Sequence, residues 1–172
     1  MDFNELAKSR YSCRSFKDER VRDEDLNQIL HAGHLAPTGC NYQPQRILLL
    51  NTEESIQKLR LVTRSHFNCP TAMLVCYNKD ECWVRKYDGI NSGVSDACSV
   101  IVHMLLMATE IGVGTTWVMH FDPEKVKCEF NIPDNIIPVG FIMMGYPADD
   151  ATPHVFHSSF RPLDDVLVKD SF

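Results

Sequence analysis

The chain has 172 residues and a formal net charge of −6 at pH 7, and this length is typical of one domain built around one core. The acidic balance excludes a general nucleic-acid binder, because a phosphate backbone requires a basic face. The first residues, MDFNELAKSR, are charged and lack an apolar stretch, so we expect neither a secretory signal nor a membrane anchor there. The sequence thus predicts a single cytoplasmic domain over residues 1–172, with no nucleic-acid or membrane partner.

The first half of the chain alternates helical and strand patterns. Acidic residues suit the start of the second helix, with Asp23 or a neighbour as its cap, and Pro37 and Gly39 end it. The strand RILLL (46–50) reads as buried. The expected helices cover residues 2–8, 23–35 and 53–64, and the expected strands cover 46–50 and 71–77.

The second half begins with a polar, glycine-punctuated segment over 80–93 that we expect to be exposed. A helix over 92–111 follows, apolar on almost every side, which is typical of a central or interface helix. Its most apolar stretch, 100–107, is too short to span a bilayer. Further elements are expected as a strand over 115–121, a helix over 123–130 capped by Asp122, a strand over 137–146 and an irregular tail. The mixture predicts an α+β fold with a sheet packed by helices.

The cysteines and histidines give little support for a metal site. Seven cysteines without CxxC spacing and without a secretory signal read as reduced thiols. The pairs His31/His34 and His154/His157 can each bring two imidazoles to one side of a turn, but a metal ion needs a third ligand. No metal ion is therefore predicted, and solvated histidines are the simpler interpretation.

Two short stretches suggest a ligand. In RYSCR (10–14), Arg10 and Arg14 can form charge-assisted bonds to a phosphate, and Ser12 can add a hydroxyl. An ordinary charged turn is the alternative. The loop over 37–43 carries amide side chains, whose donors and acceptors suit the edge of a heteroaromatic ring. A nucleophile elbow, a P-loop and a GxGxxG motif after a strand are all absent.

Four motifs in order resemble the FMN-dependent nitroreductase family, and the resemblance runs nearly from end to end. RYSCRSF (10–16) is similar to RRSxRxF, and APTGCNYQP (36–44) is similar to APSxxNxQPW. GVGTTWVMHF (112–121) resembles GLGTCWIGxF, while PVGFIMMGYP (138–147) and RPLDDV (161–166) resemble the endings PVxxxxxGYP and RRPLEEVV. The implied fold is α+β and nitroreductase-like, with a mostly antiparallel central sheet flanked by helices, in an obligate-type homodimer.

The resemblance also implies a site in which FMN lies at the dimer interface. Arg10, Ser12, Arg14 and Arg161 would hold its phosphate and ribityl chain. The 37–43 loop would approach the flavin, partly from the partner subunit, and the backbone of residues 117–120 would line the ring. The implied cofactor-binding residues are Arg10, Tyr11, Ser12, Arg14, Pro37, Thr38, Gly39, Asn41, Gln43, Trp117, Val118, Met119, His120 and Arg161.

The implied activity is an NAD(P)H-dependent oxidoreductase that reduces nitroaromatics, quinones or related electrophiles in a ping-pong cycle. Hydride passes through flavin N5, so no catalytic side chain is required. A reductive dehalogenase-like or flavin-fragmenting member of the same fold is one alternative, and a non-catalytic flavin-binding or redox-sensing protein is another. Three positions depart from the family pattern, namely Gln45 after QP, His120 in place of glycine, and Phe160 in place of a basic residue.

Overall fold

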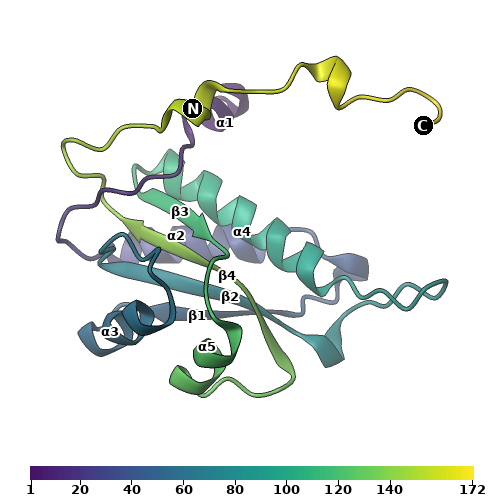
Figure 1. The fold of residues 1–172 in the computed structure, drawn as a ribbon, viewed down its shortest axis with the longest axis horizontal. Helices are drawn as coiled ribbons and strands as arrows, with labels where there is room; N and C mark the ends of the chain where they lie inside the picture. The colour runs from purple at the N-terminus through teal and green to yellow at the C-terminus, as the bar shows by residue number, and fades with distance from the viewer.

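The computed structural model describes residues 1–172 and centres on one four-stranded sheet (Figure 1). The strands β1 (Gln45–Leu50), β2 (Thr71–Asn78), β3 (Gly114–Val118) and β4 (Ile136–Gly145) lie in the order β1-β2-β4-β3. All neighbouring pairs are antiparallel. The expected α+β fold with an antiparallel sheet is therefore confirmed. Every residue of β2 is buried, because helices cover both faces of this central strand.

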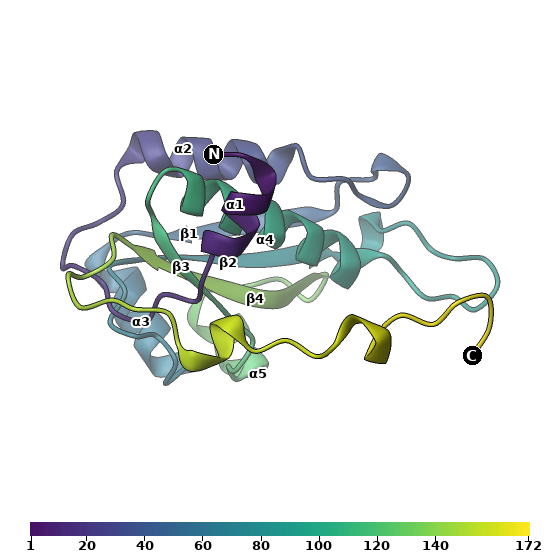
Figure 2. The ribbon, with the colours of Figure 1, turned by 90° about the horizontal axis from the view of Figure 1, so that it is seen from above.

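Helices divide between the two faces of the sheet, as Figure 2 shows. One face is covered by α2 (Asp23–His34) and α4 (Gly93–Glu110), with α1 (Phe3–Ser9) beside α4. The other face carries α3 (Glu53–Val62) and α5 (Pro123–Glu129). Each face buries its own apolar cluster, and Met73 and Ile142 belong to the first while Leu74 and Phe141 belong to the second. Successive side chains of β2 and β4 point to opposite faces of the sheet, so the two strands contribute to both apolar clusters.

The helix α2 begins at Asp23, where it was expected to begin. Arg22 occupies the N-cap position by its backbone and makes no side-chain cap bond, so Asp23 lies inside the first turn. Asp25 is buried instead and accepts hydrogen bonds from Arg22 Nε at 3.0 Å and from the Tyr146 hydroxyl at 2.6 Å. The expectation named Asp23 or a neighbour as the cap, and the structure has the neighbour Arg22 there, while Asp25 ties α2 to the end of β4.

Two strands differ from their expected form. RILLL lies in an edge strand, and β1 alternates between partly buried and exposed residues rather than being buried throughout. The apolar pattern could not distinguish a central strand from an edge strand. β3 ends at Val118, so Met119 and His120 lie in the connection to α5 rather than in the expected strand over 115–121. The helix α5 has its expected cap, since Asp122 Oδ1 accepts from the N–H groups of Glu124 and Lys125.

The helix α4 is the longest element and is more apolar than the other two long helices, α2 and α3. By length and composition alone it would suffice to cross a membrane, and 44% of that span is buried within the protein. Its inner face, including Val100, Ile101 and Met104, belongs to the core between α2 and the sheet. On its outer face Val94 is 50% exposed and Val102 is 44% exposed. The core therefore covers the inner face of α4, while Val94 and Val102 on its outer face remain exposed in a single chain.

The C-terminal tail leaves the body of the protein and runs along it as an extended segment (Figure 1). It contains two short 3-10 turns, η3 (Val155–Ser158) and η4 (Leu163–Asp165). Large apolar side chains along it are exposed, among them Phe156, Phe160 and Leu163. The expectation of an irregular tail is confirmed. Beyond the first turn the tail presents apolar side chains to solvent rather than to its own core.

Candidate functional site

The RYSCR segment is held along the outer edge of β3. Ser12 forms a parallel bridge with Thr115, and the Cys13 N–H donates to the Thr115 carbonyl at 2.9 Å. The Thr116 hydroxyl donates to the Cys13 carbonyl. A Cβ at Gly114 would lie 2.9 Å from Cys13 Sγ, so glycine is needed for this close approach. The motif is therefore fixed to β3 by one isolated bridge and by the bonds of Cys13.

A small charged cavity of about 190 Å³ lies at this segment. Neither Arg10 nor Arg14 takes part in an ion pair, and no carboxylate lines the cavity. Burial and the neighbouring Cys13 thiol raise the pKa of Tyr11 to about 12, so this phenol stays neutral and keeps its proton. The cavity is lined by Arg10, Tyr11, Ser12, Arg14, His154, Phe156 and His157. Unpaired guanidinium groups without a nearby acid are suited to bind an anion.

A larger, mostly apolar cavity of about 760 Å³ adjoins the charged one. The two cavities share Arg10 and Ser12 as lining residues. The Trp117 indole packs across β4, where a Cβ at Gly140 would lie 2.3 Å from Trp117 Nε1. That indole nitrogen is buried and has no hydrogen-bond partner. The cavity is lined by Phe3, Ala7, Arg10, Ser12, Val102, Leu105, Leu106, Trp117 and Met119.

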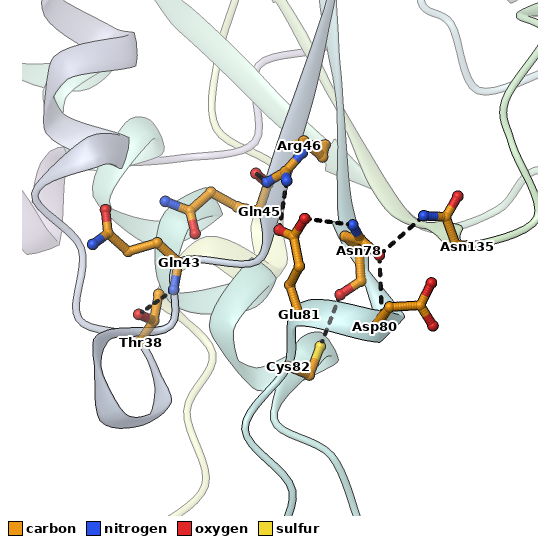
Figure 3. A network of polar contacts seen from close by, with 9 residues as sticks. All are labelled: Thr38, Gln43, Gln45, Arg46, Asn78, Asp80, Glu81, Cys82 and Asn135. Atoms are coloured by element: carbon orange, nitrogen blue, oxygen red, sulfur yellow. Dashed lines mark hydrogen bonds and ion pairs between the residues drawn. The ribbon is translucent and has the colours of Figure 1, made fainter.

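The 37–43 loop lies at the opposite, N-terminal end of α4. The Gly39 N–H donates to Asp96 Oδ1 at 2.8 Å, and the Ser92 hydroxyl donates to Asp96 Oδ2 at 2.6 Å. Within the loop, the Gln43 N–H donates to Thr38 Oγ1 at 3.1 Å (Figure 3). Cys40, Asn41 and Gln43 have positive φ angles of 48°, 59° and 51°. Such backbone costs free energy at non-glycine residues and is typical of functional loops.

A polar network fixes the exit of this loop into the sheet (Figure 3). Asn78 Nδ2 donates to Glu81 Oε1 at 2.7 Å, and Glu81 Oε2 pairs with Arg46 at the start of β1. The Asn135 amide adds a bond to Asn78 Oδ1 at 3.3 Å. Gln45 lies next to this network with its Oε1 buried and without a partner. The loop is thus anchored at both ends, by Asp96 and by the Arg46–Glu81–Asn78 network.

The structure brings together only part of the expected site. Arg10, Tyr11, Ser12, Arg14, Trp117 and Met119 line the two adjoining cavities. The Val118 side chain is buried in the core on the α3 and α5 face, so only its backbone can face a ligand. His120 lines a separate polar cavity, and its carbonyl accepts from Thr63 Oγ1 at 2.6 Å. Pro37, Thr38, Gly39, Asn41 and Gln43 line neither adjoining cavity, and Arg161 is exposed outside both.

Sequence reasoning did not assign His154 and His157 to this site, yet both line the charged cavity. They are separated from RYSCR by about 140 positions, and the only signal was their three-residue spacing. No group of three His, Cys, Asp or Glu side chains is arranged to hold a metal ion. All seven cysteines are free. Burial raises the pKa of Cys69 to about 11 and that of Cys76 to about 12, which makes both thiols unreactive at neutral pH.

Comparisons with known proteins agree with these features. A model described as the nitroreductase family matches residues 7–72 and 67–146. A nitroreductase family protein of known structure from Clostridium difficile 630 is 38% identical, with a TM-score of 0.94 over 100% of both chains. A proposed nitroreductase from Desulfovibrio desulfuricans, solved in complex with FMN, is 25% identical, with a TM-score of 0.76 over 98% of this chain and 96% of that one. A proposed NADH dehydrogenase/NAD(P)H nitroreductase from Archaeoglobus fulgidus is 27% identical over 90% of each chain.

Proposed function

The chain belongs to the nitroreductase family, and we propose that it is an FMN-dependent oxidoreductase. In this proposal it uses NAD(P)H to reduce nitroaromatics, quinones or related conjugated electrophiles in a ping-pong cycle. Residues 1–172 act as one domain. The coarser assignment to nitroreductase-type oxidoreductases follows from the family, and the FMN complex of a neighbour supports the choice of cofactor.

The pair of adjoining cavities is the observation that carries the proposal. FMN joins a phosphate to a large, flat, mostly apolar ring, and the two cavities match these two parts. The cavity of about 190 Å³ offers two unpaired arginines and no carboxylate, while the cavity of about 760 Å³ is mostly apolar. Arg10 and Ser12 lie on both. The residues present therefore fit the cofactor.

Each residue has a distinct role in this proposal. Arg10 and Arg14 bind the phosphate through charge-assisted bonds, and the Ser12 hydroxyl donates a further one. Trp117 and the aliphatic side chains of α4 exclude water from one side of the apolar cavity. Met119, just after β3, lines the apolar cavity and would lie beside the ring, and the backbone of His120 follows it directly. When bound, FMN supplies the hydride chemistry, which no side chain of this family needs to provide.

A second copy of the chain completes the site in this proposal. Val102, on the outer face of α4, lines the apolar cavity and is 44% exposed, and Met119 is 64% exposed. The preformed 37–43 loop lies at the other end of the same helix, held by Asp96. A two-fold arrangement that pairs the outer faces of α4 sets the loop of each subunit beside the cavity of the other. Pro37, Thr38, Gly39, Asn41 and Gln43 then contact the flavin of the partner.

In this proposal the exposed side of the apolar cavity determines which electron acceptors can bind. Met119 is flexible, apolar and mostly exposed at this cavity, and such a side chain adapts to ligands of different shape. Planar conjugated electrophiles can therefore stack there. The alternative of a cysteine-based redox sensor gains no support from Cys13, Cys69 and Cys76, which are buried. The exposed thiols of Cys40 and Cys128 line neither adjoining cavity.

The decisive experiment is a visible spectrum of the purified protein, followed by anaerobic addition of NADH and then NADPH. We expect flavin absorbance that bleaches promptly with at least one donor and recovers on addition of a quinone or a nitroaromatic. Bound flavin that stays oxidised with both donors contradicts the proposed activity and favours the non-catalytic alternative. A protein that takes up no FMN contradicts the cofactor assignment itself.

The composite site is tested by sedimentation velocity over a range of protein concentrations, with flavin absorbance as the signal. We expect flavin to sediment with the dimer. A flavin-loaded monomer at low concentration would contradict the role of the partner loop.

A further inference from the structure

We propose that His154 and His157 form the C-terminal half of the phosphate site and make the chain select phosphorylated flavin over riboflavin. The inference rests on the proposed function. Both histidines line the charged cavity together with Arg10, Ser12 and Arg14. They belong to the tail, whose first turn η3 brings them to the N-terminal segment.

His154 is held with one ring nitrogen free to donate. The Phe156 N–H donates to His154 Nδ1 at 3.2 Å, so Nδ1 acts as an acceptor. In a neutral imidazole the proton then lies on Nε2, which becomes a donor for a ligand. The ring also packs against Phe156 with centroids 4.7 Å apart. The orientation of this donor is therefore set before any ligand arrives.

His157 packs against the N-terminal segment that carries Arg10, Ser12 and Arg14. Its ring meets the ring of Tyr11 edge to face, with centroids 6.4 Å apart and an interplanar angle of 68°. His157 is partly buried, unlike most of the tail around it. Because Tyr11 belongs to RYSCR, this contact ties the tail to the segment that carries Arg10 and Arg14. His157 thus closes the cavity and contributes an imidazole to it.

The charges around the two histidines favour a phosphate. The facing groups on the N-terminal segment are Arg10, Tyr11 and Arg14, and no carboxylate lines the cavity. The two acidic residues just before the tail point to other partners, since Asp149 pairs with Lys17 at 3.1 Å and Asp150 accepts from the Ser15 hydroxyl at 3.0 Å. The Nε2–H of His154 and an imidazole N–H of His157 are then available as hydrogen-bond donors to the anion.

The same geometry explains why the tail needs no further basic residue at this cavity. Arg161 lies outside it, and Phe160, also outside it, lines a neighbouring surface with Ala7 and Lys8. The tail therefore reaches the charged cavity through its histidines. FMN differs from riboflavin by its phosphate. Groups at this cavity therefore affect the affinity for FMN and leave the affinity for riboflavin unchanged.

The test compares the affinities of FMN and riboflavin, measured by quenching of flavin fluorescence. The variant is His154→Ala/His157→Ala, and the matched control is His31→Ala/His34→Ala, which removes an exposed histidine pair on α2. We expect the tail variant to bind FMN at least about ten-fold more weakly, because a bond to a charged group contributes about 1.5 kcal/mol or more. Its affinity for riboflavin, and both affinities of the control, should stay unchanged.

Several outcomes overturn the inference. FMN affinity at the native level in the tail variant is one of them. An equal loss of affinity for FMN and for riboflavin is another, because it would indicate that the site of the flavin ring is distorted. Failure of the native protein to bind FMN at all would instead overturn the proposed function. The ³¹P resonance of bound FMN gives a second reading, because its chemical shift should change between the native protein and the single variant His154→Gln. An unchanged shift contradicts a phosphate contact at His154.

Discussion

Asp96, buried on α4, accepts the backbone N–H of Gly39 at 2.8 Å. This single bond joins the 37–43 loop to the central helix, and the second carboxylate oxygen is occupied by the Ser92 hydroxyl at 2.6 Å. The loop contains three non-glycine residues with positive φ, a conformation that persists only where the surroundings hold it. Asp96 is therefore the residue that keeps the loop preformed.

Replacing Asp96 by alanine should leave the Gly39 N–H and the Ser92 hydroxyl without partners. We expect the free energy of unfolding to fall by about 2–4 kcal/mol, as measured by urea denaturation. Limited proteolysis should then cut the 37–43 loop first. Asp88→Ala is the matched control, because Asp88 forms an exposed ion pair with Arg85, and such pairs contribute about 1 kcal/mol or less. Equal losses in the two variants would contradict the special role of Asp96.

Arg10 lines both adjoining cavities, so Arg10→Ala should release FMN under the proposed function. We expect purified Arg10→Ala to carry little flavin absorbance and to bind added FMN at least about ten-fold more weakly. Arg85→Ala removes the same charge from the exposed 80–93 segment and should retain flavin. Flavin occupancy at the native level in Arg10→Ala would count against the phosphate assignment.

Asp25 links α2 to the end of β4 and should make stability depend on pH. The hydrogen bond from Tyr146, and then the Arg22 guanidinium, lower the pKa of this carboxyl. Its stabilisation is complete above the ordinary carboxyl pKa of about 3.9, and it is lost as the pH falls through the lowered pKa of the folded state. Asp25→Asn should therefore cost about 1–2 kcal/mol at pH 7, with a difference from the native protein that narrows in acid. Urea unfolding of both proteins at a series of pH values measures this difference in the free energy of unfolding. A difference that grows as the pH falls would contradict the prediction.

Thiol labelling can follow the loop without any substitution. Cys40 and Cys128 are exposed, whereas burial raises the pKa of Cys69 to about 11 and that of Cys76 to about 12. Because the thiolate is the reactive form, we expect an alkylating reagent at about pH 8 to modify Cys40 and Cys128 first. Under the proposed function, FMN should slow the reaction of Cys40, in the 37–43 loop, but not that of Cys128 on α5. Peptide mass spectrometry distinguishes the two, and equal rates at Cys40 with and without FMN would place the loop away from the cofactor.

The order of helices and strands could be predicted from the sequence because hydrophobic periodicity and capping residues act locally. The position of β1 at the edge of the sheet could not be predicted in this way. Residues 47–50 are all apolar, and only the strand order places them at an edge where Leu48 is 36% exposed. The candidate site was likewise only partly predictable. The residue types of RYSCR alone predict an anion site. The position of His154 and His157 depends on how the tail packs against the N-terminal segment, which no local sequence pattern specifies.

The pairing between RYSCR and β3 also has a consequence for biosynthesis. Thr116 and Cys13, joined by a side-chain hydrogen bond, are 103 positions apart. The arginines of the motif leave the ribosome early, but the strand that orients them, β3, is translated only after β1 and β2. His154 and His157 follow later still. A nascent chain interrupted before β3 would carry the arginine motif without a surface to hold it, so under the proposed function we expect the phosphate-bearing cofactor to bind late during translation.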